Sequence, residues 1–550
     1  MVFGDLLALF GLAISCTIFY FLAREGRPKK LTVAQHLLAD RTVRSRDFGL
    51  TFAAASTSLA TVLIFFIQMS SAFGLTLLFC GITYLLGQMF FLALVKKSNL
   101  DTSHLTTNAD FWLAMTKDRS VAITISILTI TSFVTILFVE LYVGSSIVKY
   151  YIDLFSVSES GVPHQGAITS DQITTSTPLA APLAFAAIGL LIILYVRLGG
   201  LNVVIRTDAW QLRLMLASMG ALILFAIFTP AIVPAAAAGD ATAAAATEAT
   251  DWSQLFAFSA SWNSVIVFWL FLAILNFTLP FTQVSSWQRV AASKDIGEAW
   301  MGFLKSIPAF LTLWLVPVIA LVILQVKGYS ISSLEGLFDA MRSSEDGFIE
   351  GILYPIMFVG FASALFSTGD TALIALQLSL ADNTTFGENL ATKDEVALRR
   401  VLIWGSVAVI AVLAGIFAIA EANVGNWFMP LVYAIFGQLA IAAPCLIYVL
   451  RRASVGKRGA SLTQTGSRFC VVGLLLGWAT IIVATVLKGL EQLPQQYTQE
   501  VATFIGIAFS LAGLLLGLRF RIPGSDDAPH DLGVIQVSDS DETPQSLGGK

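Results

Sequence analysis

One stretch of the chain places oxygen-bearing side chains inside an otherwise apolar segment. In FVGFASALFSTGDTALIAL, at 358–376, Ser367, Thr368, Asp370 and Thr371 lie close together. A hydroxyl or carboxyl group at membrane depth needs a partner, because lipid supplies none. Hydroxyls and main-chain carbonyls are also ligands that a small hard cation prefers. The stretch therefore indicates either a cation site or hydroxyls that bond the carbonyls of their own helix, as Ser and Thr often do.

A second stretch begins with an unusual run of small and hydroxyl residues. It is FAAASTSLATVLIFFIQMSSAFG, at 52–74, and the run is AAASTS at 53–58. Small residues let a neighbouring helix approach closely. They also permit a break in the helix, and the carbonyls freed there can bind an ion where the break lines a cavity. From the residues alone, a tight helix crossing and an ion-binding break both remain open.

A third stretch, YVRLGGLNVVIRTDAWQ at 195–211, combines a glycine pair with an acidic residue. The glycines end one predicted span, and Thr207 and Asp208 stand at the predicted start of the next. A carboxylate at that position complements the positive end of a helix. The alternative is that Asp208 lies on the path of an ion.

A fourth stretch, NFTLPFTQVSSWQRVAASKD at 276–295, contains a proline at membrane depth. Pro280 is expected to kink or break the seventh span. The polar residues around it are Asn276, Thr278, Thr282 and Gln283. They predict either contacts to a solute, for which Gln283 is the best candidate, or hydrogen bonds between helices. Arg289 and Lys294 are interpreted as anchors at the membrane boundary.

The composition explains which elements must position these residues. The chain has 550 residues, of which 56% are hydrophobic and 12% charged, whereas a soluble domain carries roughly 25% charged residues. The apolar residues fall in blocks of about 20, the length that spans a bilayer as a helix. The sequence therefore predicts an all-α polytopic membrane protein. Neither a phosphate-binding loop nor a catalytic acid/base pair is visible, so we expect neither an ATP-driven pump nor an enzyme. The net charge of −4 names no partner besides the lipid bilayer, and no nucleic acid is expected.

The predicted domain is one helical bundle over 1–521, followed by a disordered acidic tail over 522–550. Thirteen spans are predicted near 1–23, 48–67, 73–95, 121–150, 180–196, 208–235, 255–282, 303–326, 350–380, 400–420, 426–450, 468–488 and 499–518. Lys and Arg alternate with this pattern: the 24–47 loop is rich in them, while the loops at 151–179 and 236–253 have none. The positive-inside rule then places the N-terminus outside the cell membrane, plasma or inner, and the C-terminus in the cytoplasm.

Three segments together resemble the sodium:solute symporter family, which includes the sugar, proline and pantothenate symporters. GGLNVVIRTDAWQ at 199–211 resembles the family's Gly-Gly…Thr-Asp-x-x-Gln signature. WQRVAASKD at 287–295 resembles the segment after the seventh span, and ALFSTGDTAL at 364–373 resembles the Ser-Thr-Ala-Asp-Ser segment of the ninth. Their order and spacing agree with the family, as do the 13 spans. The resemblance covers about residues 5–520.

The resemblance implies a leucine-transporter-like fold of two inverted five-span repeats, at about 48–235 and 255–450, each with a broken first helix. It also implies a sodium site. Its ligands would be the main-chain carbonyls of Ala55, Ser58 and Ala364 and the hydroxyls of Ser367 and Thr368. Asp208 matches an acidic position that the family links to ion movement.

The resemblance also guides the solute site. Tyr142 resembles the tyrosine that lines the cavity of proline symporters. Together with polar residues near the two predicted helix breaks, it gives the predicted solute-binding set Thr57, Thr61, Tyr142, Asn276 and Gln283. Thr57 stands where proline symporters carry an Asp, and Phe65-Phe66-Ile67-Gln68 stands where many relatives have a Gly-Pro pair.

The expected function is secondary active transport, in which inward sodium flow drives uptake of a small polar solute by alternating access. Sodium is the expected coupling ion. The solute class (organic acid, amino acid or sugar) is left open. Two alternatives remain: proton-coupled symport on the same fold, and a sensor or receptor that keeps the fold without much transport.

Overall fold

A computed structural model describes residues 3–25, 32–98, 107–159, 180–231, 261–342, 344, 346–381, 395–420, 424–457, 459–492 and 498–522. The regular elements over these ranges are helices. The predicted acidic tail, apart from Ile522, lies outside the described residues, as do parts of the expected repeats around 232–260.

Twelve ranges among the described residues are long and apolar enough to cross a membrane. One of them, Leu59–Lys97, has 39 residues. As a single helix it would be about 58 Å long, twice the ~30 Å hydrocarbon core of a bilayer. Gly74, with a φ of 51°, separates it into α4 (Phe65–Phe73) and α5 (Leu78–Lys97). Counted in this way, the described residues contain 13 candidate spans, the number predicted.

The helices of the first half lie within residues 3–231. They are α1 (Phe3–Glu25), α2 (Val33–Leu38), α3 (Ser45–Ala55), α4, α5, α6 (Asn108–Thr116), α7 (Arg119–Glu159), α8 (Ala180–Gly199) and α9 (Leu201–Phe228). The helices of the second half are α10 (Trp262–Thr282), α11 (Val284–Ala292), α12 (Ile296–Val326), α13 (Leu334–Arg342), α14 (Tyr354–Ala381), α16 (Glu395–Ala420), α17 (Val424–Ser454), α18 (Gln464–Gly489) and α19 (Thr498–Arg519).

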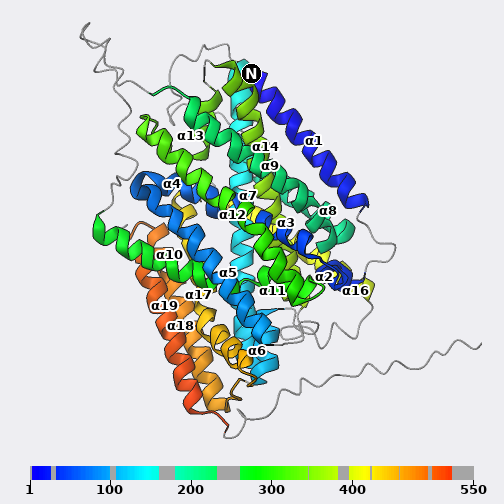
Figure 1. Cartoon of the computed structure of the whole chain (residues 1–550), viewed down its shortest axis with the longest axis vertical. Helices are drawn as coiled ribbons and strands as arrows, with labels where there is room; N and C mark the ends of the chain where they lie inside the picture. The colour runs from blue at the N-terminus through cyan, green and yellow to red at the C-terminus, as the bar shows by residue number, and fades with distance from the viewer. Residues whose placement is uncertain are drawn as a thin grey trace, which may run out of the picture.

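The centre of the bundle is formed by α14 and α7, while α1 lies at one edge and α18 and α19 form a pair at the opposite edge (Figure 1). The most apolar part of Ile349–Ala381, the range that contains α14, is 83% buried inside the protein, against 22% for α1. Large apolar side chains of the outer helices, such as Phe10, Trp404 and Leu515, are exposed. The outer helices therefore present an apolar surface suited to lipid, and α14 is positioned by protein contacts on nearly every side.

One glycine sets the distance between α14 and its main neighbour, α9. A Cβ atom at Gly360 would overlap the side chain of Ser218 and the carbonyl of Leu214. Only glycine therefore allows the two helices to lie this close. As a result, Ser367 of α14 and Asp208 of α9, about two to three turns away from this contact, face each other.

The short helix α2 docks against the same pair of helices. Nε2 of His36, which is fully buried, lies 2.9 Å from Oε1 of Gln377 in α14. Gly200, with a φ of 59°, lies against the backbone of His36 and connects α8 to α9. Burial lowers the pKa of His36 from its ordinary value of 6.5 to about 4. The nearby Arg399 guanidinium contributes to the lowering, and the Gln377 contact opposes it.

Acidification is therefore expected to loosen the docking of α2. Docked His36 stays neutral down to about pH 4, whereas an undocked His36 takes up a proton below about pH 6.5. The contribution of neutral His36 to the docking of α2 is fully present above pH 6.5. It is lost as the pH falls from 6.5 towards 4, by about 3 kcal/mol in all. The measurement is amide hydrogen exchange of residues 33–41 in purified protein at pH 7.5 and pH 5, at one temperature. The exchange rates are corrected for the effect of pH on the intrinsic rate of each amide. His36→Gln, which cannot titrate, should show a smaller pH effect; an equal effect in both proteins would contradict the assignment.

Candidate functional site

The second span is interrupted at the AAASTS run, where the residues alone left a break and a continuous, tightly packed helix open. α3 ends at Ala55, and a π-helical segment, Leu59–Ile64, leads into α4. Ser58 between them is extended, with φ −78° and ψ 143°, and its hydroxyl accepts a hydrogen bond of 2.7 Å from the Thr61 N–H. Serine is a preferred residue for starting a helix in this way. The AAASTS run at 53–58 therefore contains both the end of α3 and the residue that starts the next helix.

A buried carboxylate caps this new helix start. Glu140 of α7 accepts hydrogen bonds from the Ser58 hydroxyl and from the Ala60 N–H, the latter at 3.3 Å. Glu140 is fully buried. The first N–H groups of a helix lack partners within it and carry partial positive charge, so a carboxylate stabilises the break. The signal for this residue in the sequence is a carboxylate inside the apolar 121–150 span.

A second interruption separates α10 from α11. Gln283 is extended there, with φ −73° and ψ 111°. Pro280 has no N–H to continue the helix ladder, which agrees with the predicted kink or break. The freed carbonyls of Thr282 and Phe281 accept hydrogen bonds of 2.8 Å from the Asn108 side chain and from the Trp287 indole. Asn108 was not singled out from the sequence, because only the fold brings α6 to this break.

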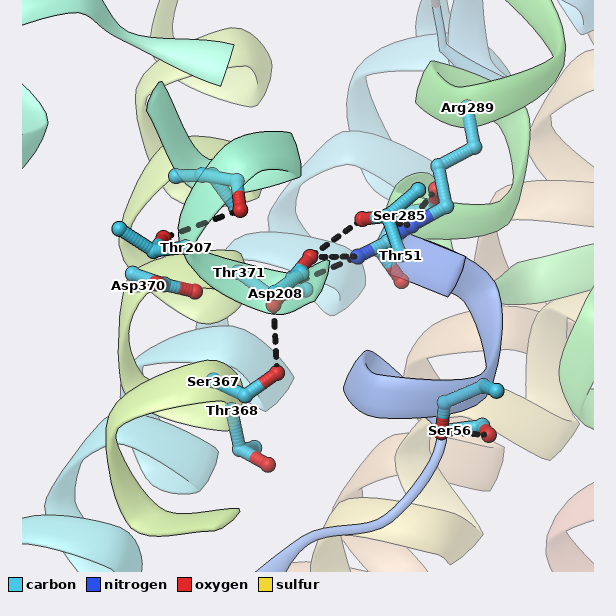
Figure 2. Close-up of polar contacts among 12 residues, drawn as sticks. Thr51, Ser56, Thr207, Asp208, Ser285, Arg289, Ser367, Thr368, Asp370 and Thr371 are labelled. Atoms are coloured by element: carbon cyan, nitrogen blue, oxygen red, sulfur yellow. Dashed lines mark hydrogen bonds and ion pairs between the residues drawn. The ribbon is translucent and has the colours of Figure 1, made fainter. Parts of the chain in front are cut away.

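The hydroxyls of Ser367 and Thr368 point away from their own helix (Figure 2). Ser367 donates to Oδ1 of Asp208 at 2.6 Å, and Thr368 lies with Oγ1 3.5 Å from the Thr57 carbonyl. A hydroxyl that donates its proton outward keeps its oxygen lone pairs for a further ligand. Thr368 thus places an oxygen directly opposite the break of the second span.

Asp208 lies deeper than predicted. α9 begins at Leu201 after the turn at Gly200, so Asp208 stands two turns inside the helix. The expectation that it complements a helix start is wrong. The Thr51 hydroxyl donates to Oδ2 of Asp208, and Ser367 donates to Oδ1, so both carboxylate oxygens have partners (Figure 2).

Arg289 also differs from its interpretation as a boundary anchor. It is 5% exposed and lies inside the bundle, because the break at Gln283 turns α11 inward. Its Nη2 is 4.0 Å from Oδ2 of Asp208 and donates to the Thr371 hydroxyl at 3.0 Å. The nearby Asp370 accepts a hydrogen bond of 2.8 Å from Tyr195. A guanidinium and two carboxylates therefore lie together on the inner faces of α9, α11 and α14.

Both helix breaks line one cavity. Its walls include Ala55 and Ser58 from the first break, Gln283 from the second and Thr368 from α14. Thr61 and Trp314 line this central cavity and also a neighbouring one, whose walls include Asn276 and several aromatic rings. The geometry at the first break is therefore open to a small ligand rather than closed by helix packing.

Two solved structures share this arrangement of helices. A sodium-coupled sialic acid symporter, in a substrate-bound outward-open state, matches with a TM-score of 0.57 at 14% identity, over 96% of this chain and 99% of that chain. A manganese transporter of Eremococcus coleocola matches with a TM-score of 0.51 at 15% identity, over 89% of this chain and 98% of that chain. Models of known families give no match to the sequence, and neither do curated proteins.

The chain has the leucine-transporter-like fold. It is a multi-pass membrane protein, and the structures it matches are transporters rather than enzymes. At 14–15% identity the likeness concerns the fold, and it leaves the ion and the solute of this chain to be argued from its own residues.

The predicted site residues divide into three groups in this fold. Ala55, Ser58, Thr61, Gln283 and Thr368 line the central cavity, and Asn276 lines the neighbouring one. Thr57, Ala364 and Ser367 are buried immediately beside them. Tyr142 lies elsewhere, with its ring packed 5.6 Å from that of Phe417 and 6.1 Å from that of Phe428. The Ser58 carbonyl accepts a hydrogen bond of 3.2 Å from Leu63 N, which leaves it one lone pair.

Proposed function

We propose that this protein is a sodium-coupled symporter of the sodium:solute symporter family, which takes up a small polar solute by alternating access. One observation carries the proposal. The Thr368 hydroxyl lies next to the break of the second span, and both line a cavity that the second helix break also lines. Broken helices of this kind supply ion ligands in secondary transporters, because their main-chain groups are not used by the helix.

The sodium site consists of the carbonyls of Ala55, Ser58 and Ala364 and the hydroxyls of Ser367 and Thr368. The position of Thr368 opposite the Thr57 carbonyl, at 3.5 Å, supports it. Asp208 is one hydrogen bond behind Ser367 and supplies negative charge without occupying the site. Neutral oxygens with a carboxylate behind them suit a monovalent ion that must also leave. Asp208 lies on the path of that ion.

The solute occupies the central cavity and the adjoining one, in contact with Thr61 and Gln283 in the first and with Asn276 in the second. Thr57 lies next to these walls in the chain, beside Ser58. Ser58 and Thr61, three residues apart, connect the ion ligands to the solute walls. Binding of either one therefore raises the affinity for the other by the same factor. The packing of Tyr142 between α16 and α17 gives its predicted contact with solute less support than the other four have. In the cell membrane, the N-terminus lies outside and the end of α19 inside, as the distribution of Lys and Arg favours.

The test is a melting-temperature screen of purified protein against organic acids, amino acids and sugars, in sodium chloride and in choline chloride of equal concentration. A ligand in excess over its Kd raises the melting temperature. We expect the solute to raise the melting temperature in sodium. In choline, the Kd of the solute should be at least about 10-fold higher, since affinity coupling of this size is typical. A solute effect that follows pH and ignores sodium would favour proton-coupled symport, and binding without uptake into proteoliposomes would favour a sensor.

A further inference from the structure

We infer that the solute is an organic anion with an apolar body, whose carboxylate binds Arg289 and whose apolar part occupies the neighbouring aromatic cavity. This inference rests on the proposed function and names the class of its solute. It starts from the side chains that line the central cavity.

Arg289 is the only Lys, Arg, His, Asp or Glu among the described residues that line the central cavity. The other polar residues that line this cavity carry a hydroxyl or an amide; they are Ser56, Ser58, Thr61, Tyr84, Gln283, Ser285, Ser286, Thr368 and Thr371. A cationic solute in this cavity would lie near the positive charge of Arg289 in a medium of low dielectric constant, and the repulsion would weaken its binding. An anionic solute would meet the guanidinium that lines the cavity, whereas the nearby Asp208 and Asp370 carboxylates are not among the lining residues.

The guanidinium has donors to spare. Three of its five N–H groups are accounted for by neutral oxygens: Nε donates to Thr51 at 3.4 Å, Nη1 to the Ser285 carbonyl at 3.2 Å and Nη2 to Thr371 at 3.0 Å. The Asp208 carboxylate is 4.0 Å away, beyond hydrogen-bond distance, and both of its oxygens accept hydrogen bonds from hydroxyls. Asp208 thus offsets part of the charge of Arg289 without using its remaining N–H groups, and a planar fork of this kind matches a carboxylate.

The second cavity indicates what the rest of the solute is. Thr61, Val62, Trp314 and Phe436 line both cavities, so the two adjoin. The other walls of the second cavity are apolar apart from Asn276, and four of them are aromatic: Phe65, Phe66, Phe271 and Tyr433. Aromatic and aliphatic groups are the usual walls for the apolar part of a ligand. A solute that reaches from Arg289 into this cavity therefore has a charged end and an apolar end.

The experiment compares matched probes on the wild-type protein, so that it does not depend on a variant that folds. The probes are acetate, hexanoate and 3-phenylpropanoate, with hexanamide and 3-phenylpropanamide as neutral counterparts and 3-phenylpropylamine as the cation. Melting temperature in sodium chloride is the readout. We expect 3-phenylpropanoate to bind at least about 10-fold more tightly than its amide, since hydrogen bonds to a charged group are worth that much, and more tightly than acetate.

Variants then assign the two ends of the solute. Arg289→Gln should abolish the preference for acid over amide, and Arg289→Lys, which keeps the charge and loses the fork, should keep part of it. Phe271→Ala should weaken 3-phenylpropanoate while leaving acetate unchanged. Arg206→Gln, an exposed arginine of α9, is the control and should bind the probes as the wild type does.

Two results would overturn the inference. One is an amide or amine that binds as tightly as the acid. The other is the failure of every acid to bind while sodium alone still raises the melting temperature. In both cases the ion site survives, so the proposed function is separable from the solute class; loss of the sodium effect itself would instead contradict the proposed function.

Discussion

Replacing Thr368 with alanine is expected to weaken sodium binding by at least about 10-fold and to abolish sodium-dependent solute uptake. The variant removes one of five proposed oxygen ligands, and each charge-assisted contact of this kind is worth about 1.5–3 kcal/mol. Folding should change little, because the hydroxyl makes one long hydrogen bond, 3.5 Å, to the Thr57 carbonyl. The measurement is the sodium concentration that gives half of the maximal rise in melting temperature, at constant ionic strength.

Two variants make the Thr368 experiment specific. Thr368→Ser keeps the hydroxyl and should retain most of the sodium affinity. Thr485→Ala removes a buried hydroxyl of α18 that bonds its own helix at Ile481, and it should leave sodium affinity unchanged. A Thr368→Ala protein that responds to sodium as the wild type does would rule out this residue as a ligand.

Replacing Glu140 with alanine is expected to destabilise the fold by about 3 kcal/mol or more and to remove the sodium response. The Ser58 hydroxyl and the Ala60 N–H would lose their acceptor in a buried site, and each unsatisfied buried donor costs about 1–3 kcal/mol. Ser58 starts the helix that follows the break of the second span. The main-chain carbonyls of Ala55 and Ser58 would therefore also lose their fixed positions. The measurements are urea or thermal unfolding in detergent and the sodium-dependent rise in melting temperature.

The loss of stability should depend on which residue replaces Glu140. Glu140→Gln keeps one acceptor oxygen of the same reach and should fall between the wild type and Glu140→Ala in stability. Glu25→Ala, an exposed carboxylate at the end of α1, should match the wild type. If Glu140→Ala were as stable as the wild type and still responded to sodium, the carboxylate would have no part in holding the break.

The spans were predictable because lipid imposes a length of about 20 apolar residues on each helix. The second helix break was predictable from local chemistry, since Pro280 disfavours a continuous helix. The AAASTS run only permits a break, and the resemblance to the symporter family is what favoured it. The outward direction of the Ser367 and Thr368 hydroxyls was one of two open alternatives. It is decided by the approach of α9 and α3 to α14, which depends on Gly360 fitting against Ser218.

The charged residues show where sequence reasoning stops. Arg289 follows a span and resembles a boundary anchor, yet the break at Gln283 turns it into the bundle beside Asp208. Asp208 follows a glycine pair and resembles a helix-start residue, yet α9 already begins at Leu201. In both cases the local pattern is compatible with two depths. The partner that decides between them comes from a different helix, and no periodicity in the sequence identifies it.

The central claim is that the broken second span and the hydroxyls of α14 together hold a sodium ion. Equilibrium binding of sodium-22 to purified protein, without solute and with choline chloride holding the ionic strength constant, tests this claim most directly. The account predicts saturable binding by the wild type that unlabelled sodium displaces and potassium does not, and its loss in Thr368→Ala. Absence of saturable binding in folded wild-type protein, or equal binding by Thr368→Ala, would contradict it.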